Sequence, residues 1–169
     1  MGIRDSTSGR VGGVDNPAWG EVVKHVPLAS AAECQSALEN AANAFPAWAE
    51  TPPGRRAQVL YAYRELLYRH MDELAEIVSE EHGKTLDDAK GSITRGLEVV
   101  EFACGIPQLL KGEYSECVAT GVDSWSMRQP EGVCVGMKRF NFPAVVPMWL
   151  VIVVFALGNT VRCNRVDSG

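Results

Sequence analysis

The sequence lacks several features that would each assign it to a class of protein. Its five cysteines form no C-x-x-C pair, which argues against a disulfide framework or a zinc site and favours a cytoplasmic location. No basic segment precedes an apolar run near Met1, so no secretory signal is expected. An excess of positive charge is also missing, because the formal net charge is -5. We therefore expect no metal site and no nucleic-acid partner.

A long uninterrupted apolar run is missing as well, although residues 140–161 carry no charge. Pro143 and Pro147 interrupt the first half of this span, and Asn141 and Asn159 are polar. The remaining apolar stretch is short for a bilayer. A helix buried against a sheet needs the same composition, so we expect no membrane partner.

What the sequence does contain is a strand, turn, helix and strand pattern within residues 132–160. Residues 133–137 predict a short apolar strand, and a polar turn follows that ends at Pro143. Residues 144–157 predict a buried helix, and a second strand follows. This order is typical of a nucleotide-binding α/β unit, whose ligand lies at the carboxyl ends of the strands. The sequence therefore predicts an α/β fold with its chemistry in the turn after Met137.

Asn141 lies in that turn and has two possible roles. Its side-chain amide carries two donors, which could stabilise a developing oxyanion. Asparagine also commonly forms turns or caps a following helix. The residues alone favour the second role.

The remainder of the sequence predicts helices between two extended regions. Residues 1–15 are expected to be poorly ordered, residues 21–28 to form a strand or half of a hairpin, and residues 118–127 a strand. Ser30 and Glu33 match the capping-box pattern of a helix start. Other predicted boundaries are a start at residues 51–53, a division near residues 70–72, an end at Gly83 and a start at Thr85.

Three motifs resemble one known family. Residues 128–143 read RQPEGVCVGMKRFNFP, residues 81–85 read EHGKT, and residues 95–107 read RGLEVVEFACGIP. Together they are similar to the aldehyde dehydrogenase superfamily. Phe140 before Asn141 resembles the CoA-acylating methylmalonate-semialdehyde dehydrogenase branch, since most members carry Trp there. The resemblance covers residues 16–160, nearly the whole sequence.

The resemblance implies a fold and an activity. Residues 16–169 would form an incomplete, Rossmann-like NAD-binding domain with N-terminal helices, and residues 118–132 would begin an oligomerisation hairpin. The complete enzyme would be a homo-oligomer that oxidises malonate or methylmalonate semialdehyde with NAD and releases the acyl group to CoA. The catalytic domain would lie outside the 169 residues.

The resemblance also implies site residues. Asn141 would stabilise the oxyanion, and Arg95 would hold the substrate carboxylate, which a planar guanidinium can bind through two parallel hydrogen bonds. Lys138 and Phe140 would form part of the cofactor wall. Asn164 would stand where the family carries a ribose-binding lysine, and Asp167 near the following acidic position.

Departures from the family pattern limit this expectation. Lys138 and Arg139 replace a small residue and a proline. We expect the strand that relatives carry before residue 21 to be missing or altered. The nucleophilic cysteine of the family is absent. The chain alone should therefore be inactive and bind NAD weakly or not at all. Two alternatives stay open: a piece of a non-acylating aldehyde dehydrogenase, or a non-enzymatic remnant that associates with a full-length partner.

Overall fold

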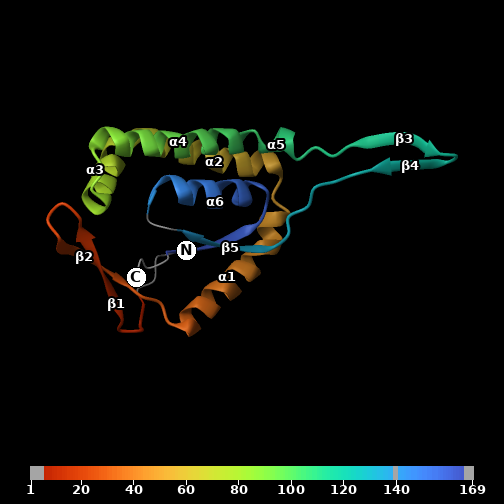
Figure 1. Cartoon of the computed structure of the whole chain (residues 1–169). Coiled ribbons are helices and arrows are strands. Elements are labelled where there is room, and N and C mark those ends of the chain that lie inside the picture. The colour runs from red at the N-terminus through yellow and green to blue at the C-terminus, as the bar shows by residue number, and fades with distance from the viewer. Residues whose placement is uncertain (1–5, 139–140, 166–169) are drawn as a thin grey trace.

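A computed structural model describes residues 6–138 and 141–165 (Figure 1). The first element is an antiparallel hairpin of β1 (Val11–Asn16) and β2 (Glu21–Pro27). The predictions of a poorly ordered segment through residue 15 and of no strand before residue 21 are therefore wrong from Val11 onward. Gly12 and Gly13 weaken the strand signal, but a Cβ on Gly13 would lie 3.3 Å from Val22. Gly13 thus lets β1 pack closely against Val22 of β2.

The segment before β1 is fastened to the first helix, α1 (Ala31–Ala49). The capping box of Ser30 and Glu33 is present as predicted. Glu33 also accepts hydrogen bonds from the Thr7 backbone amide and the Ser6 hydroxyl. Backbone hydrogen bonds from Ser30 and Thr7 lower the pKa of Glu33 to about 2, because they favour the charged carboxylate. Residues 1–5 lie outside the described residues.

The next helices follow the predicted boundaries. They are α2 (Pro53–Arg69), α3 (Met71–His82), α4 (Leu86–Cys104) and the short α5 (Ile106–Leu109). The predicted division near His70 is confirmed, and Gly83 ends α3 in the left-handed conformation, with φ 78°. Thr85 caps α4 by accepting a hydrogen bond from the Asp88 backbone amide. Local signals of this kind could be recognised without tertiary information.

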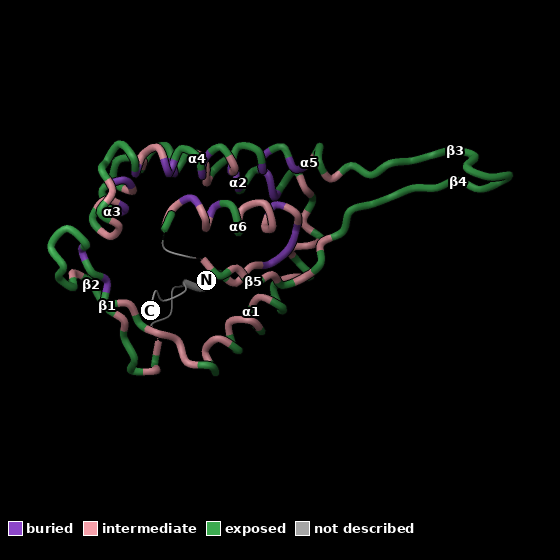
Figure 2. The backbone as a smooth tube through the Cα atoms, in the orientation of Figure 1, coloured by how far each residue is buried: buried purple, intermediate pink, exposed green. Residues whose placement is uncertain are grey.

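After α5 the chain forms a projecting hairpin of β3 (Tyr114–Ala119) and β4 (Val122–Trp125). A single strand over residues 118–127 was expected, and this is wrong because the chain reverses at Gly121, which has φ 69°. Every residue of both strands is exposed (Figure 2). At the base of the hairpin, a Cβ on Gly112 would overlap the Ser126 carbonyl oxygen. The two backbone segments therefore approach as closely as glycine allows.

The predicted strand, helix and strand unit is confirmed. β5 (Val133–Lys138) pairs in parallel with β6 (Thr160–Arg165), and α6 (Val145–Ala156) connects them. In Figure 1, α2 and α4 lie over one face of α6, while α1 crosses on the opposite side of the β5–β6 pair. The core lies between α2, α3, α4 and α6, where Ile93, Leu97 and Val100 are almost fully buried. No helix within the described ranges combines the length and hydropathy needed to cross a bilayer.

Glycine allows α4 and α6 to approach closely. A Cβ on Gly96 would lie 2.3 Å from the Met148 sulfur and 3.4 Å from the Met148 Cβ, so a larger residue there would force the Met148 side chain to move. Glycine in a helix interior costs about 1 kcal/mol relative to alanine. The close contact between the helices offsets this cost, and it places α4 directly beside the helix that follows the Asn141 turn.

Arg56 connects the ends of two helices. It is only 4 % exposed, and its Nε donates to the Ala156 carbonyl oxygen at 2.9 Å. Its Nη1 donates to the carbonyl oxygens of Ala49 and Thr51. These acceptors lie at the C-terminal ends of α6 and α1, where carbonyl groups lack intrahelical partners and the helix dipole favours a cation. Arg56 therefore stabilises the position of α1 against the βαβ unit.

Replacing Arg56 with methionine should lower the free energy of unfolding by about 2–4 kcal/mol, because hydrogen bonds from a charged group are lost and carbonyl groups are left unpaired. Arg55→Met is the matched control, since Arg55 is exposed on the same helix, and it should change stability by less than about 0.5 kcal/mol. Urea unfolding followed by circular dichroism measures both. Equal midpoints for the two variants would contradict the role given to Arg56.

Candidate functional site

The candidate site is the turn between β5 and α6. Lys138 ends β5, and its Nζ donates to the Pro143 carbonyl oxygen at 3.4 Å, so this side chain spans the turn. Asn141 is exposed and lies after the carboxyl end of a parallel strand, where sequence reasoning placed it. The same edge of the sheet carries Asn164, whose backbone is in register with Met137.

Two predicted cofactor residues cannot be placed at this edge. Phe140 and Asp167 lie outside the described residues, as does Arg139. The structure therefore places Lys138 next to the backbone of Asn164 at the sheet edge, with Asn141 in the turn that Lys138 spans. Their roles toward a cofactor or substrate stay predictions.

Lys84 reaches this turn from the connection between α3 and α4. Its ammonium lies 4.3 Å from the centre of the Phe142 ring, within the range of a cation–π interaction. Its Nζ also lies 3.3 Å from an Asp88 carboxylate oxygen and 3.4 Å from the Ser92 hydroxyl. Sequence reasoning quoted Lys84 within a motif but gave it no role. The partner ring lies 58 residues later in the sequence, and no local pattern indicates the pair.

Arg95 is exposed on α4. The next residue, Gly96, packs against Met148 of α6. About one helical turn before Arg95, the Ser92 hydroxyl accepts a hydrogen bond from Lys84. The helix that carries Arg95 therefore packs directly against the helix that follows Asn141. This arrangement is compatible with the predicted carboxylate site but does not test it.

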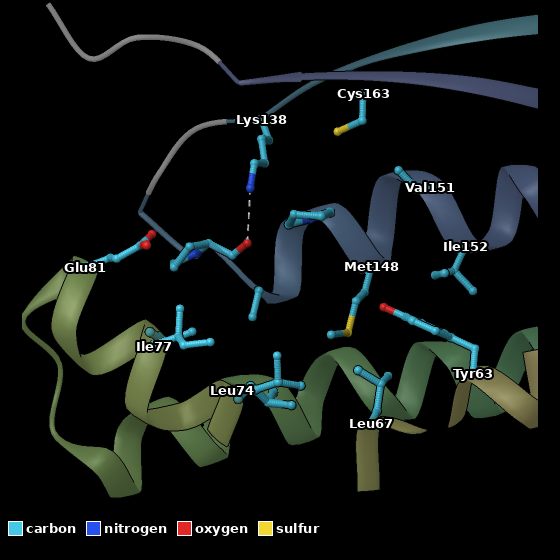
Figure 3. Close-up of a pocket in the computed structure, with 15 residues that line it drawn as sticks. Tyr63, Leu67, Leu74, Ile77, Glu81, Lys138, Met148, Val151, Ile152 and Cys163 are labelled. Carbon is cyan, nitrogen blue, oxygen red and sulfur yellow. Dashed lines mark hydrogen bonds between the residues drawn. The ribbon is translucent and has the colours of Figure 1, made fainter. Parts of the chain in front are cut away.

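A cavity of about 500 Å³ opens beside the turn (Figure 3). Apolar side chains from α2, α3 and α6 form most of its wall. Its polar members are Tyr63, Glu81, Lys138 and Cys163. Burial raises the pKa of Tyr63, which keeps the phenol protonated. Neither Asn141 nor Arg95 is among the described residues that line this cavity, so a shared substrate pocket would have to lie on another side of the turn.

Sequence reasoning missed this cavity. Tyr63, Leu67, Leu74 and Ile77 recur at helical spacing in the sequence, and this pattern predicts only that they share one apolar face. The structure shows that part of it borders open space next to Lys138. Helical periodicity indicates which side chains face inward, but it does not show how completely a neighbour fills the space.

The five cysteines are all free. Cys104 is buried, and burial raises the pKa of its thiol, which disfavours the nucleophilic thiolate. Cys117 is exposed on the projecting β3–β4 hairpin. Across residues 6–138 and 141–165, no three His, Cys, Asp or Glu side chains gather as a metal site would require.

Comparisons with known proteins agree with this geometry. The model of the aldehyde dehydrogenase family matches residues 3–164. Malonate-semialdehyde dehydrogenase of Pseudomonas aeruginosa is 50% identical over 153 residues, which are 90% of this chain and 31% of that protein. The acylating, mitochondrial methylmalonate-semialdehyde dehydrogenase of Arabidopsis thaliana is 48% identical over 147 residues, 87% of this chain and 24% of that protein.

Solved structures extend the similarity to three dimensions. A structure from Sinorhizobium meliloti, described as a methylmalonate-semialdehyde dehydrogenase complexed with NAD, is 49% identical with a TM-score of 0.91, over 96% of this chain and 33% of that one. An NAD-dependent benzaldehyde dehydrogenase from Corynebacterium glutamicum is 28% identical with a TM-score of 0.88, over 96% and 35%. The chain thus spans between about a quarter and a third of the length of these proteins. With its family model matched along nearly its whole length, the chain belongs to the aldehyde dehydrogenase family.

Proposed function

We propose that the chain is the N-terminal part of an NAD-dependent, CoA-acylating malonate- or methylmalonate-semialdehyde dehydrogenase. The observation that supports this branch is the contrast in sequence identity. Malonate- and methylmalonate-semialdehyde dehydrogenases are 42–50% identical to the chain, whereas the benzaldehyde dehydrogenase is 28% identical. The TM-scores of the two structures, 0.91 and 0.88, are nearly equal. Fold similarity therefore does not separate the branches, and the excess identity favours the semialdehyde enzymes.

The residues at the sheet edge fit a dinucleotide. In a βαβ unit of this kind the cofactor lies at the carboxyl ends of the parallel strands, and Lys138 and Asn164 occupy those ends. Bound there, NAD would accept a hydride from the substrate carbon. Lys138 would line the cofactor wall together with Phe140, and Asn164 would offer an uncharged hydrogen bond to the ribose.

In the proposed reaction Asn141 and Arg95 act on the substrate. A thiol from a part of the enzyme outside these residues attacks the aldehyde carbon, and the carbonyl oxygen gains negative charge. The Asn141 amide donates hydrogen bonds to that oxygen, while Arg95 holds the distal carboxylate. After oxidation, CoA accepts the acyl group from the thioester. The packing of the helix that carries Arg95 against the helix that follows Asn141 is compatible with this assignment.

A chimera tests the proposal. The chain would replace the matching segment of the Pseudomonas aeruginosa enzyme, to which it is 50% identical. We expect this chimera to reduce NAD with malonate semialdehyde and to depend on CoA. Turnover without CoA would instead support a non-acylating dehydrogenase. A folded chimera that oxidises benzaldehyde but not malonate semialdehyde would refute the proposed branch.

Replacing Arg95 with methionine in the chimera should lower kcat/KM for malonate semialdehyde about 100-fold, mainly through KM, because a charge-assisted hydrogen bond contributes about 1.5–3 kcal/mol. Activity with propanal, which has no carboxylate, should not change. Arg69→Met is the matched control, since Arg69 is also exposed at a helix surface. Equal losses with both aldehydes would show that Arg95 does not recognise the carboxylate.

Replacing Asn164 with lysine should strengthen NAD binding roughly 10- to 100-fold, because one charge-assisted hydrogen bond to the ribose would be gained. Titration of the chimera with NAD, followed by calorimetry, measures the change. Asn40→Lys, on the exposed surface of α1, controls for a general effect of added charge. An unchanged dissociation constant would remove Asn164 from the cofactor site.

The projecting hairpin supports a further part of the proposal, that the complete enzyme is a homo-oligomer. Tyr114 and Trp125 are each 64% exposed and lie opposite one another in the β3–β4 register. Large exposed apolar side chains on an unpaired strand edge favour association with another chain.

A further inference from the structure

Lys84 is held in a fixed position by the helix ends on both sides of it. Gly83 ends α3 in a left-handed conformation and Thr85 caps α4. The Ser79 hydroxyl donates to the Lys84 carbonyl oxygen at 2.7 Å. Because both neighbours are fixed by helix geometry, the Lys84 side chain starts from a well-defined backbone position.

The side chain of Lys84 is mostly withdrawn from solvent. Only 10% of it is exposed, although lysine is rarely buried. Asp88 and Ser92 bind the ammonium from α4, and the Phe142 ring covers it at 4.3 Å. A cation–π interaction strengthens as the cation loses water, so this burial favours the contact with Phe142.

Phe142 connects Lys84 to the turn of the candidate site. It follows Asn141 directly, and its carbonyl oxygen accepts a hydrogen bond from the Val146 amide in the first turn of α6. The ring is thus bound to the α3–α4 connection while the backbone is bound to α6. We propose that Lys84 is a positioning residue that holds the Asn141–Phe142 turn in the orientation needed for oxyanion stabilisation. The inference rests on the function proposed above.

A purely structural role for Lys84 would leave Asn141 unaffected. In that case only the contacts of the Lys84 ammonium with Asp88 and Ser92 of α4 would matter. Removing the ammonium would then lower the stability of the fold without moving the turn. The distinguishing observation is therefore local to Asn141 and Phe142. NMR of the chain with labelled asparagine and lysine reports on both residues. The ring of Phe142 shifts the signals of nearby protons, and protons above the ring resonate upfield, so a movement of the ring changes these signals.

Three variants make the test specific. Lys84→Met keeps the aliphatic stem but removes the charge, and it should shift the Asn141 side-chain amide signals. Lys84→Arg keeps a cation that can stack on the ring and should restore the wild-type positions. Lys90→Met is the matched control, because Lys90 on α4 is also ion-paired, with Asp72 of α3, but its side chain is 45% exposed. It should leave the Asn141 signals unchanged.

The lysine side-chain signals supply a second measurement, in the wild-type chain and in one Phe142 variant. The Lys84 side-chain methylene protons should resonate upfield of those of Lys90, and Phe142→Leu should abolish this difference while shifting the Asn141 signals. Ordinary Lys84 shifts in the folded chain, or Asn141 signals that are the same in Lys84→Met and wild type, would overturn the inference. These readouts do not depend on turnover, so they can fail or succeed separately from the proposed enzyme activity.

Discussion

Purified alone, the chain should form no NADH from malonate semialdehyde, NAD and CoA, while the chimera does. Asn141 can stabilise an oxyanion only after a nucleophile has attacked, and the proposal places that nucleophile outside these residues. Cys104 is buried with a raised pKa, and Cys117 lies on the hairpin. Cys163 borders the cavity, so it is the thiol whose role most needs a test. Turnover that disappears in Cys163→Ser would show that the chain carries its own nucleophile.

The same isolated chain should associate rather than remain a monomer. One face of β5 exposes Val133, Val135 and Met137, with Met137 71% exposed, and α6 exposes Trp149. Apolar surface next to an unpaired strand edge favours association. Light scattering after size-exclusion chromatography measures the mass. A stable monomer would contradict this part of the prediction, and a specific complex with a full-length relative would favour the non-enzymatic alternative.

Replacing Asn141 with alanine in the chimera should lower kcat about 10²–10³-fold, as expected for loss of one oxyanion donor. KM for the aldehyde and the affinity for NAD should change little, because the amide interacts with charge that develops only in the transition state. Steady-state kinetics and a separate NAD titration distinguish these effects.

The control for Asn141 is Asn40→Ala, which removes an exposed amide that bonds the Ser36 carbonyl oxygen on α1. It should retain kcat. A small change in kcat for Asn141→Ala, with intact folding, would favour the alternative in which Asn141 only shapes the turn. Lost NAD binding would indicate that the substitution collapsed the turn itself.

The sequence allowed prediction of those parts of the fold that local interactions determine. The capping box at Ser30, the division at His70 and the glycine end at Gly83 each depend on residues within one or two turns. The βαβ unit was also predictable, because a short apolar strand and an uncharged helix flank a turn with a proline stop. Fold class followed from that order of elements.

Features that depend on distant partners could not be predicted in the same way. β1 contains Gly12 and Gly13 and has little strand propensity by itself, so its pairing with β2 had to be observed. The reversal at Gly121 was hidden within what we interpreted as a continuous strand. In the site, Asn141 could be located because the turn that contains it is visible in the sequence. The contact of Lys84 with Phe142 joins two motifs that are distant in sequence, and local periodicity does not indicate such a contact.

The contacts that hold α1 have a consequence for synthesis on the ribosome. Trp48 stacks on Phe155 and bonds its carbonyl oxygen 107 residues away, and the Thr160 hydroxyl bonds Ala41 across 119 residues. At about 5–20 residues per second, α1 waits on the order of 5–20 s before these partners are translated. None of its own residues is fully buried even afterwards. During that interval α1 is a nascent helix without its docking surface, and slow translation through residues 50–155 would prolong its availability to chaperones.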